Sequence, residues 1–370
     1  MRYVDEFRDS ALAAELLASI RRKSTRPIRL MEVCGTHTMS IARSGIKAML
    51  PDSIRLLSGP GCPVCVTPQR QIDQFIQLGG RPNTVLATFG DMLRVPGSNS
   101  NLEVERAKGA DVRIVYSPLD AVELACGMPE RELIFFGIGF ETTAPAVALS
   151  ILEAERRGLR NYYVLCAHKL IPPALAALAS DPDINIHGFI CPGHVSTIIG
   201  SRAYRTVARD YGIPCVVAGF EPLDILQAIY MLVDQVEQGR NQVENQYSRA
   251  VSPDGNRGAM RCIDHAFQLA SSEWRGLGSI PASGLHIRRE YRGFDASILV
   301  SEAPPNSDAE SVGNICECGA ILKGMKTPRE CRAFGTACTP ERPIGACMVS
   351  SEGACAAEFK YSSHREEVRA

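Results

Sequence analysis

The chain has 370 residues, of which 45% are apolar and 22% charged, and a formal net charge of −1. A chain of this length is too long to fold around one ordinary hydrophobic core, so two or three domains are expected. The near-zero net charge predicts neither a nucleic-acid nor an acidic-membrane partner. No apolar run of about 18 residues is present to span a membrane. The N-terminal residues lack the apolar core of a signal peptide, which predicts a cytoplasmic protein.

Along the chain, an amphipathic helix predicted at residues 5–22 is followed by short apolar runs that alternate with amphipathic stretches. The apolar runs predict strands at 28–33, 54–57, 85–88, 112–116, 133–138, 162–166, 188–191 and 214–218. The stretches between them predict helices that include 39–49, 69–78, 119–125, 144–156, 198–210 and 222–238. This alternation indicates an α/β fold with mainly parallel sheets flanked by helices. The length favours two similar lobes over a single sheet.

The predicted division is an N-terminal helix at 1–24, a first lobe at 25–126, a second lobe at 127–240 and a C-terminal domain at 241–370. After Gly239 the chain becomes polar and rich in turn residues, with one more helix expected at 259–271. Beyond residue 303 regular periodicity fades and Cys, Gly and Pro become frequent. Such a segment buries little apolar area, so we expect an inorganic centre to organise an irregular, partly helical iron–sulfur domain.

The C-terminal domain holds six of the 14 cysteines: Cys316, Cys318, Cys331, Cys338, Cys347 and Cys355. Clustered cysteines in a large cytoplasmic protein are more typical of metal or redox chemistry than of disulfide staples. Four thiolates bind a cubane [4Fe–4S] cluster, which would leave two thiols as a redox pair. Structural zinc is one alternative, although the spacing is not that of a zinc ribbon. Free or disulfide-linked thiols are the other.

Three further cysteines lie where two predicted strands end. Cys34 follows the first apolar run, and Cys62 and Cys65 form a Cys-x-x-Cys on the Gly/Pro-rich turn after the second. Ligands in open α/β sheets bind at strand ends, so these thiols are expected to share one crevice. A thiolate at the start of the helix that follows would be a good soft-metal ligand. Zinc held with His37, a redox dithiol with an independent Cys34, and inert buried cysteines remain the alternatives.

Polar residues also end the later strands, at His168-Lys169, Cys191-Pro192-Gly193-His194, Gly219-Phe220-Glu221-Pro222 and Gly90–Gly97. Together they suggest a cleft in the second lobe that faces the thiols of the first. Gly137–Thr143 follows a strand and opens a helix, but it lacks the third glycine of a dinucleotide fingerprint, so a nucleotide site is only weakly indicated.

Taken together, these motifs resemble the HypD family of hydrogenase maturation factors. The matching segments are Cys34-Gly35-Thr36-His37-Thr38, Gly59–Cys65, Phe140–Pro145, Cys191–Ser196, Ala218–Pro222, Phe334–Pro340 and Gly345–Cys355. They span nearly the whole chain in order, which is more specific than any single motif.

The resemblance implies a scaffold on which the Fe(CN)2CO unit of [NiFe] hydrogenases is assembled before its transfer to the hydrogenase large subunit. The family works with the chaperone HypC, and cyanide comes from HypE with HypF. The resemblance also implies two related α/β lobes and a domain that carries a [4Fe–4S] cluster. The surroundings of this cluster are similar to those of the cluster in ferredoxin:thioredoxin reductase.

By that similarity the cluster ligands would be Cys316, Cys331, Cys338 and Cys355, with Cys318 and Cys347 as the redox pair. Iron would be held at Cys34, with Cys62 and Cys65 as redox or ligand-exchange thiols and His37 shaping the pocket. Such a protein is an accessory assembly factor with redox activity rather than a turnover enzyme. The competing functions are a stand-alone iron–sulfur thiol-disulfide oxidoreductase and a non-catalytic binding module braced by metal.

Overall fold

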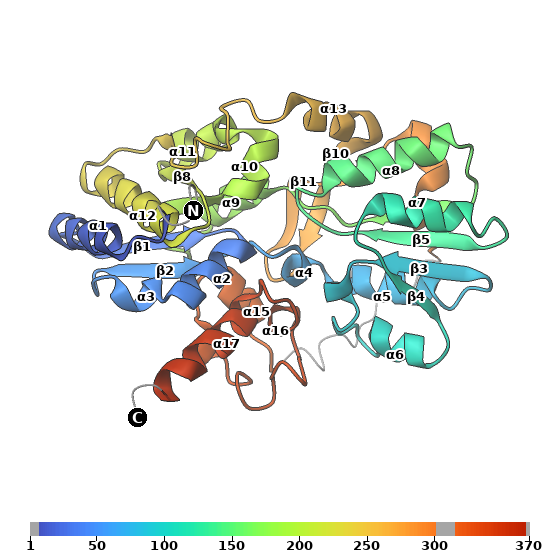
Figure 1. The fold of residues 1–370 in the computed structure, drawn as a ribbon, viewed down its shortest axis with the longest axis horizontal. Helices are drawn as coiled ribbons and strands as arrows, with labels where there is room; N and C mark the ends of the chain where they lie inside the picture. The colour runs from blue at the N-terminus through green and yellow to red at the C-terminus, as the bar shows by residue number, and fades with distance from the viewer. Residues whose placement is uncertain (1–6, 301–314, 368–370) are drawn as a thin grey trace.

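The computed structural model describes residues 7–300 and 315–367. Two parallel sheets lie side by side, each flanked by helices, and the C-terminal segment packs below them in the view of Figure 1. The strand order is β2-β1-β7-β8-β9 in one sheet and β4-β3-β5-β6 in the other. The predicted α/β fold with parallel sheets is confirmed. Within the described ranges, no helix is both long enough and apolar enough to cross a membrane.

The first sheet contains β1 (Ile28–Glu32), β2 (Ile54–Ser58), β7 (Gly188–Pro192), β8 (Cys215–Ala218) and β9 (Val243–Asn245). Side chains that alternate along its strands enter two different cores, because successive residues of a strand point to opposite faces. One face is covered by α1 (Ser10–Lys23), α2 (Gly35–Ser44), α3 (Ile46–Met49) and α12 (Pro222–Glu237). The other face is covered by α9 (Ile171–Ser180), α10 (Gly193–Ile199) and α11 (Arg205–Tyr211).

The second sheet contains β3 (Thr84–Thr88), β4 (Asp111–Ile114), β5 (Glu132–Gly137) and β6 (Tyr162–Cys166). On one face it packs against α7 (Pro118–Cys126) and α8 (Ala144–Arg156), and on the other against α5 (Gln69–Leu78), where Phe75 stacks on Phe136. A further helix, α6 (Leu102–Ala107), precedes β4. The strands are nearly continuous apolar runs because both faces of a parallel sheet are covered.

The two sheets do not divide the chain at residue 126. The expected break falls between β4 and β5, and both strands belong to the second sheet. The chain instead crosses from the first sheet to the second after β2 and returns after β6. The first crossover carries the Cys62-x-x-Cys65 segment and its short helix α4 (Pro63–Val66), which lies between the two sheets in Figure 1.

The helix predicted at 259–271 is wrong for its last five residues. Helix α13 (Arg257–Ala266) ends where an antiparallel hairpin begins, formed by β10 (Phe267–Trp274) and β11 (Gly278–Ile287). Three of the less exposed positions of β10, Phe267, Ala270 and Trp274, are spaced as on a helix face, so the local pattern alone does not reveal the strand. A hairpin is stabilised by the pairing of its two strands, and that pairing is invisible in a single helical window.

Glycines split two other predicted helices. Gly45 has a φ of 70° and separates α2 from α3, and Gly200, with a φ of 79°, separates α10 from the following 3-10 turn. The predicted N-terminal helix begins at Ser10, and its expected residues 5 and 6 lie outside the described ranges.

The C-terminal segment is irregular, as predicted, with α15 (Cys318–Leu322), α16 (Ala346–Val349) and α17 (Ala354–Glu367) as its helices. The 3-10 turns of the described chain include η2 (Gly90–Met92), η3 (Ser201–Tyr204), η4 (Arg289–Phe294), η5 (Ala296–Leu299) and η6 (Pro328–Glu330).

Candidate metal and thiol centre

Cys34 lies at the carboxyl end of β1, at the point where the strand order of the first sheet reverses. Strand β1 pairs with β2 on one side and with β7 on the other, and the Val33 amide donates to the carbonyl of Ile190 at 3.3 Å. The chain leaves β1 toward β2 and later returns to β7 on the opposite side. Such a switch point is where open α/β sheets form their binding crevice.

The two cysteine loops touch through their backbones. The Gly35 amide donates to the Gly61 carbonyl at 2.8 Å. A Cβ added at Gly61 would overlap the backbone nitrogen of Cys34. Only glycine therefore lets the Cys62 loop lie directly against Cys34, as the sequence predicts for thiols at the ends of neighbouring strands.

The Cys34 thiol is buried at the start of α2, among opposing electrostatic influences. Burial raises its pKa to about 12, and the amides of His37 and Thr36 act in the opposite direction. The carboxylates of Glu352 and Glu32 raise it further. A thiol held neutral in this way loses its proton when a cation binds, because a coordinated thiol is deprotonated outright.

Glu32 shapes the same pocket from within β1. Its side chain is fully buried, accepts a hydrogen bond from the Thr38 hydroxyl at 2.6 Å and accepts another from the Cys34 amide at 3.1 Å. Burial raises the pKa of Glu32 to about 7. Sequence patterns did not indicate this residue, because a glutamate at the end of a strand is usually solvated.

His37 lies on α2 and is fully buried against the loop that follows β8. Its Nε2 is 2.9 Å from the Gly219 carbonyl oxygen, which can only accept, so Nε2 carries the proton. Burial lowers the pKa of His37 to about 4, which keeps the ring neutral. Its Nδ1 is buried and has no hydrogen-bond partner among the described residues.

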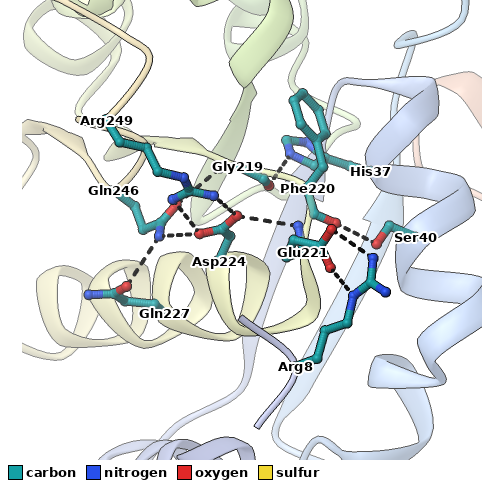
Figure 2. A network of polar contacts seen from close by, with 10 residues as sticks. All are labelled: Arg8, His37, Ser40, Gly219, Phe220, Glu221, Asp224, Gln227, Gln246 and Arg249. Atoms are coloured by element: carbon teal, nitrogen blue, oxygen red, sulfur yellow. Dashed lines mark hydrogen bonds and ion pairs between the residues drawn. The ribbon is translucent and has the colours of Figure 1, made fainter. Parts of the chain in front are cut away.

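A polar network fixes the loop that holds His37, as Figure 2 shows. The Phe220 carbonyl accepts from the Ser40 hydroxyl at 2.7 Å. Glu221 is bound by Arg8, and its amide donates to the buried carboxylate of Asp224 at 3.3 Å. Asp224 is also bound by Arg249 and Gln246 (Figure 2). The His37 ring and its carbonyl partner are therefore held in place by both α2 and α12.

Cys62 and Cys65 occupy the ends of one turn of α4. Their Cα atoms are 5.2 Å apart, and the structure pairs them as a disulfide. The Cys65 Sγ lies 3.9 Å from the carbonyl oxygen of Ala346, the residue before Cys347. The loop that carries the Cys-x-x-Cys therefore lies against the Cys34 backbone through Gly61 and against the residue before Cys347 through Cys65.

All six C-terminal cysteines line one small cavity, together with Ile321, Ala333, Phe334, Gly345 and Met348. Burial and the surrounding thiols raise the pKa of Cys355. The Cys318 thiol contacts both Cys316 and Cys347. In the described part of the chain, no three Cys, His, Asp or Glu side chains converge closely enough to hold a single metal ion. Six thiols around a common, otherwise apolar cavity are a donor set that fits a cubane cluster.

The C-terminal segment is anchored directly on the site. The Thr36 hydroxyl donates to Glu352 Oε1 at 2.7 Å, and Gly35 leaves no room for a Cβ beside Glu352. The Ser350 hydroxyl donates to Asp91 at 3.1 Å. Glu352 was not singled out from the sequence, although its Ser-Ser-Glu-Gly-Ala-Cys segment was.

The strand-end motifs separate into two groups. Gly219–Pro222 and Cys191–His194 belong to the first sheet and border His37, where the rings of His194 and Phe220 stack at 3.9 Å. His168 and Lys169 instead end a strand of the second sheet, and Lys169 donates to Gln71 and Ser272. Of the motifs predicted to line the cleft, those of the first sheet therefore lie near Cys34.

Comparison with known proteins identifies relatives along the whole chain. The HypD profile, described as the hydrogenase formation hypA family, matches residues 11–362. The chain is 50% identical to hydrogenase maturation factor HypD of Azotobacter vinelandii over 378 residues, which cover 100% of this chain and 99% of that protein. It is 49% identical to HypD2 of Bradyrhizobium diazoefficiens, with 99% and 98% covered, and 43% identical to HypD of Escherichia coli K12, with 100% of both covered.

Proposed function

The chain belongs to the HypD family of hydrogenase maturation factors, and from that premise we propose that it is the scaffold on which an Fe(CN)2CO unit is held and kept reduced. In this proposal the iron is cargo, bound at Cys34 and passed to the hydrogenase large subunit. The supporting observation is that the loop of the Cys62–Cys65 pair lies against the Cys34 backbone through Gly61, and that Cys65 lies against Ala346, the neighbour of Cys347 in the six-cysteine cavity.

The chemistry of Cys34 suits such a cargo. A soft thiolate is a suitable ligand for low-spin Fe(II) that carries cyanide and carbon monoxide. The Cys34 thiol is buried, and the Gly61 loop lies against its backbone, so this chain would contribute few ligands and the HypC partner the rest. The neutral His37 ring, with its bare Nδ1, would act as an acceptor in the pocket rather than as a cation.

A [4Fe–4S] cluster, held by Cys316, Cys331, Cys338 and Cys355, would supply the electrons that return the neighbouring Cys318–Cys347 pair from its disulfide to its dithiol form. The step within this chain is a thiol–disulfide exchange. The Cys318 and Cys347 dithiol passes two electrons and two protons to the Cys62–Cys65 disulfide, so one pair becomes the disulfide and the other the dithiol. The contact of Cys65 with the start of α16, which carries Cys347, supports an exchange between these two pairs.

In the same proposal, HypC binds over the Cys34 crevice, and HypE with HypF delivers cyanide. The test is an anaerobic preparation of the full chain with HypC, assayed for iron and by infrared spectroscopy. We expect iron in excess of the cluster's own and absorption bands of bound CN and CO. Cluster iron alone, without such bands, would overturn the proposed cargo role.

A stand-alone thiol-disulfide oxidoreductase is the second candidate, and the Cys62–Cys65 disulfide favours it. It differs in a measurable way, because it would turn over a generic disulfide substrate without any bound diatomic ligand. Catalytic reduction of such a substrate by the isolated chain would favour it over the scaffold.

A further inference from the structure

The tip of the β10–β11 hairpin lies between the two thiol centres, and none of the motifs above includes it. The Arg275 amide donates to the Val66 carbonyl at 2.8 Å, and Arg275 Nε donates to the Thr67 carbonyl at 2.9 Å. Nη1 donates to Gln69 Oε1 at 3.2 Å. The hairpin tip is thus bound to the end of α4, the helix that carries Cys65.

The same tip touches the C-terminal cysteines through a pair of glycines. Gly276 has a φ of 80°, and a Cβ there would overlap the Cα of Gly319. Gly319 follows Cys318 in α15. The backbones of the hairpin and of α15 can approach this closely only because both residues lack a side chain.

The rest of the hairpin is firmly anchored, so the position of its tip is determined. The Trp274 indole donates to the Ser283 hydroxyl at 2.9 Å and stacks on Phe140 at 6.0 Å. The buried Lys169 ammonium donates to the Ser272 hydroxyl at 2.7 Å. The first contact holds the two hairpin strands together, and the contacts of Phe140 and Lys169 tie the hairpin to the strand ends of the second sheet.

The charge of Arg275 is not cancelled by its partners, since its guanidinium donates to a carbonyl and an amide oxygen, both neutral. Its Nη2 is buried and has no acceptor within the described ranges. The hairpin tip that carries this charge lies against Gly319, the residue that follows Cys318.

We propose that Arg275 is a positioning residue for electron transfer between the two thiol pairs, as a fixed positive charge that the hairpin tip holds between Cys65 and Cys318. The proposal rests on the thiol–disulfide exchange of the proposed function. In that exchange a thiolate attacks a disulfide sulfur, and negative charge spreads over the sulfurs involved. In a buried site such charge is costly, and a nearby guanidinium lowers the cost.

The test follows the reduction of Cys62–Cys65 in the full-length, cluster-containing chain. Dithionite is added anaerobically, samples are quenched and alkylated at intervals, and mass spectrometry measures the reduced fraction of each cysteine. Replacing Cys347 with serine removes the internal donor pair, so Cys347→Ser gives the rate of direct reduction by dithionite.

Arg275→Gln is expected to slow the reduction of Cys62–Cys65 about tenfold relative to the native chain, as the loss of one nearby charge predicts. Arg275→Lys keeps the charge but loses the forked contacts to Thr67 and Gln69, and it should retain most of the rate. Gly276→Ala displaces the tip with Arg275 intact and should also be slow. Gly278→Ala, at a φ of 76° with no atom within 4 Å of the added Cβ, is the matched control for backbone strain and should match the native rate.

If Arg275→Gln reduces Cys62–Cys65 at the native rate while Cys347→Ser is slow, this inference is overturned, but the thiol–disulfide exchange is still supported. Equal slowing by Arg275→Lys and Arg275→Gln would also overturn it, because the charge would then have no role. A native rate in Cys347→Ser would overturn both the exchange step and the inference. Iron content and circular dichroism of each variant establish that it is folded and carries its cluster.

Discussion

At the scale of single residues, the strand ends of both sheets carry buried ionisable groups whose neutral forms the fold prefers. Burial raises the pKa of Glu32 and of Glu141 to about 7 and lowers that of His168 to about 3. Such groups cost stability when they carry charge. Of the three, Glu32 lies at the Cys34 site, where it accepts a hydrogen bond from the Cys34 amide.

Glu141 gives a pH-dependent prediction at this scale. Its Oε1 accepts from the Ile171 amide at 2.9 Å, and its Oε2 has no partner among the described residues. Its folded pKa of about 7 exceeds the ordinary 4.5, so the folded state binds more protons between these values and the free energy of unfolding falls as pH rises through this window. Glu141→Gln should remove this fall, which is at most about 3 kcal/mol.

The measurement is urea unfolding of both proteins at pH 5 and pH 8. The stability of Glu141→Gln relative to the native chain should be higher at pH 8 than at pH 5. The same difference at both pH values would show that Glu141 does not titrate in this window.

At the scale of elements, the site depends on two loops that meet without side chains between them. Gly61 lies against the backbone of Cys34 at the start of α2, and Gly35 lies against Glu352. The strands β1 and β2 run in register from Ile28 and Ile54 to Glu32 and Ser58. Their ends therefore coincide, and small residues there decide how closely the thiols approach.

Gly61→Ala should consequently destabilise the fold, by about 1–3 kcal/mol, because the added methyl group must displace the backbone of one loop. Gly80→Ala is a suitable control, because the nearest atom to its added Cβ is the Gln77 carbonyl oxygen at 3.4 Å. The free energies of unfolding come from denaturant titration. Equal free energies of unfolding for Gly61→Ala and Gly80→Ala would show that the close contact between the two loops is not needed for stability.

Much of this arrangement follows from local sequence. Strands with both faces buried are continuous apolar runs, so β1 and β2 were predicted within one residue, and with them the convergence of Cys34 with Cys62. The pairing of β1 with β7 was not predictable, because it joins segments more than 150 residues apart. The roles of Arg275 and Glu352 could not be predicted for the same reason, because each contacts a loop that is distant in the sequence.

At the scale of the whole molecule, the C-terminal segment joins the two sheets. It contacts α2 through Glu352, η2 through Ser350 and α4 through Ala346. Its helices are short, apart from α17, and its core is a cavity lined by thiols. A segment with so little apolar area of its own is expected to depend on an inorganic centre.

Removal of the proposed cluster, by air oxidation and chelation, should therefore loosen residues 315–361 while both sheets stay folded. Hydrogen exchange measured by mass spectrometry is the appropriate method, because it reports local opening. Protection should fall around α15 and α16 and persist in β1 and β5. Unchanged protection in the C-terminal segment would contradict a structural role for the cluster.

The central claim is that Cys34 holds the iron that carries the diatomic ligands. The most direct measurement is infrared spectroscopy of the chain co-purified anaerobically with HypC, in native form and as Cys34→Ala. Cys215→Ala, which removes a buried thiol from β8, is the matched control. The account predicts CN and CO bands in the native protein and in Cys215→Ala, and their loss in Cys34→Ala. Undiminished bands in Cys34→Ala would contradict it.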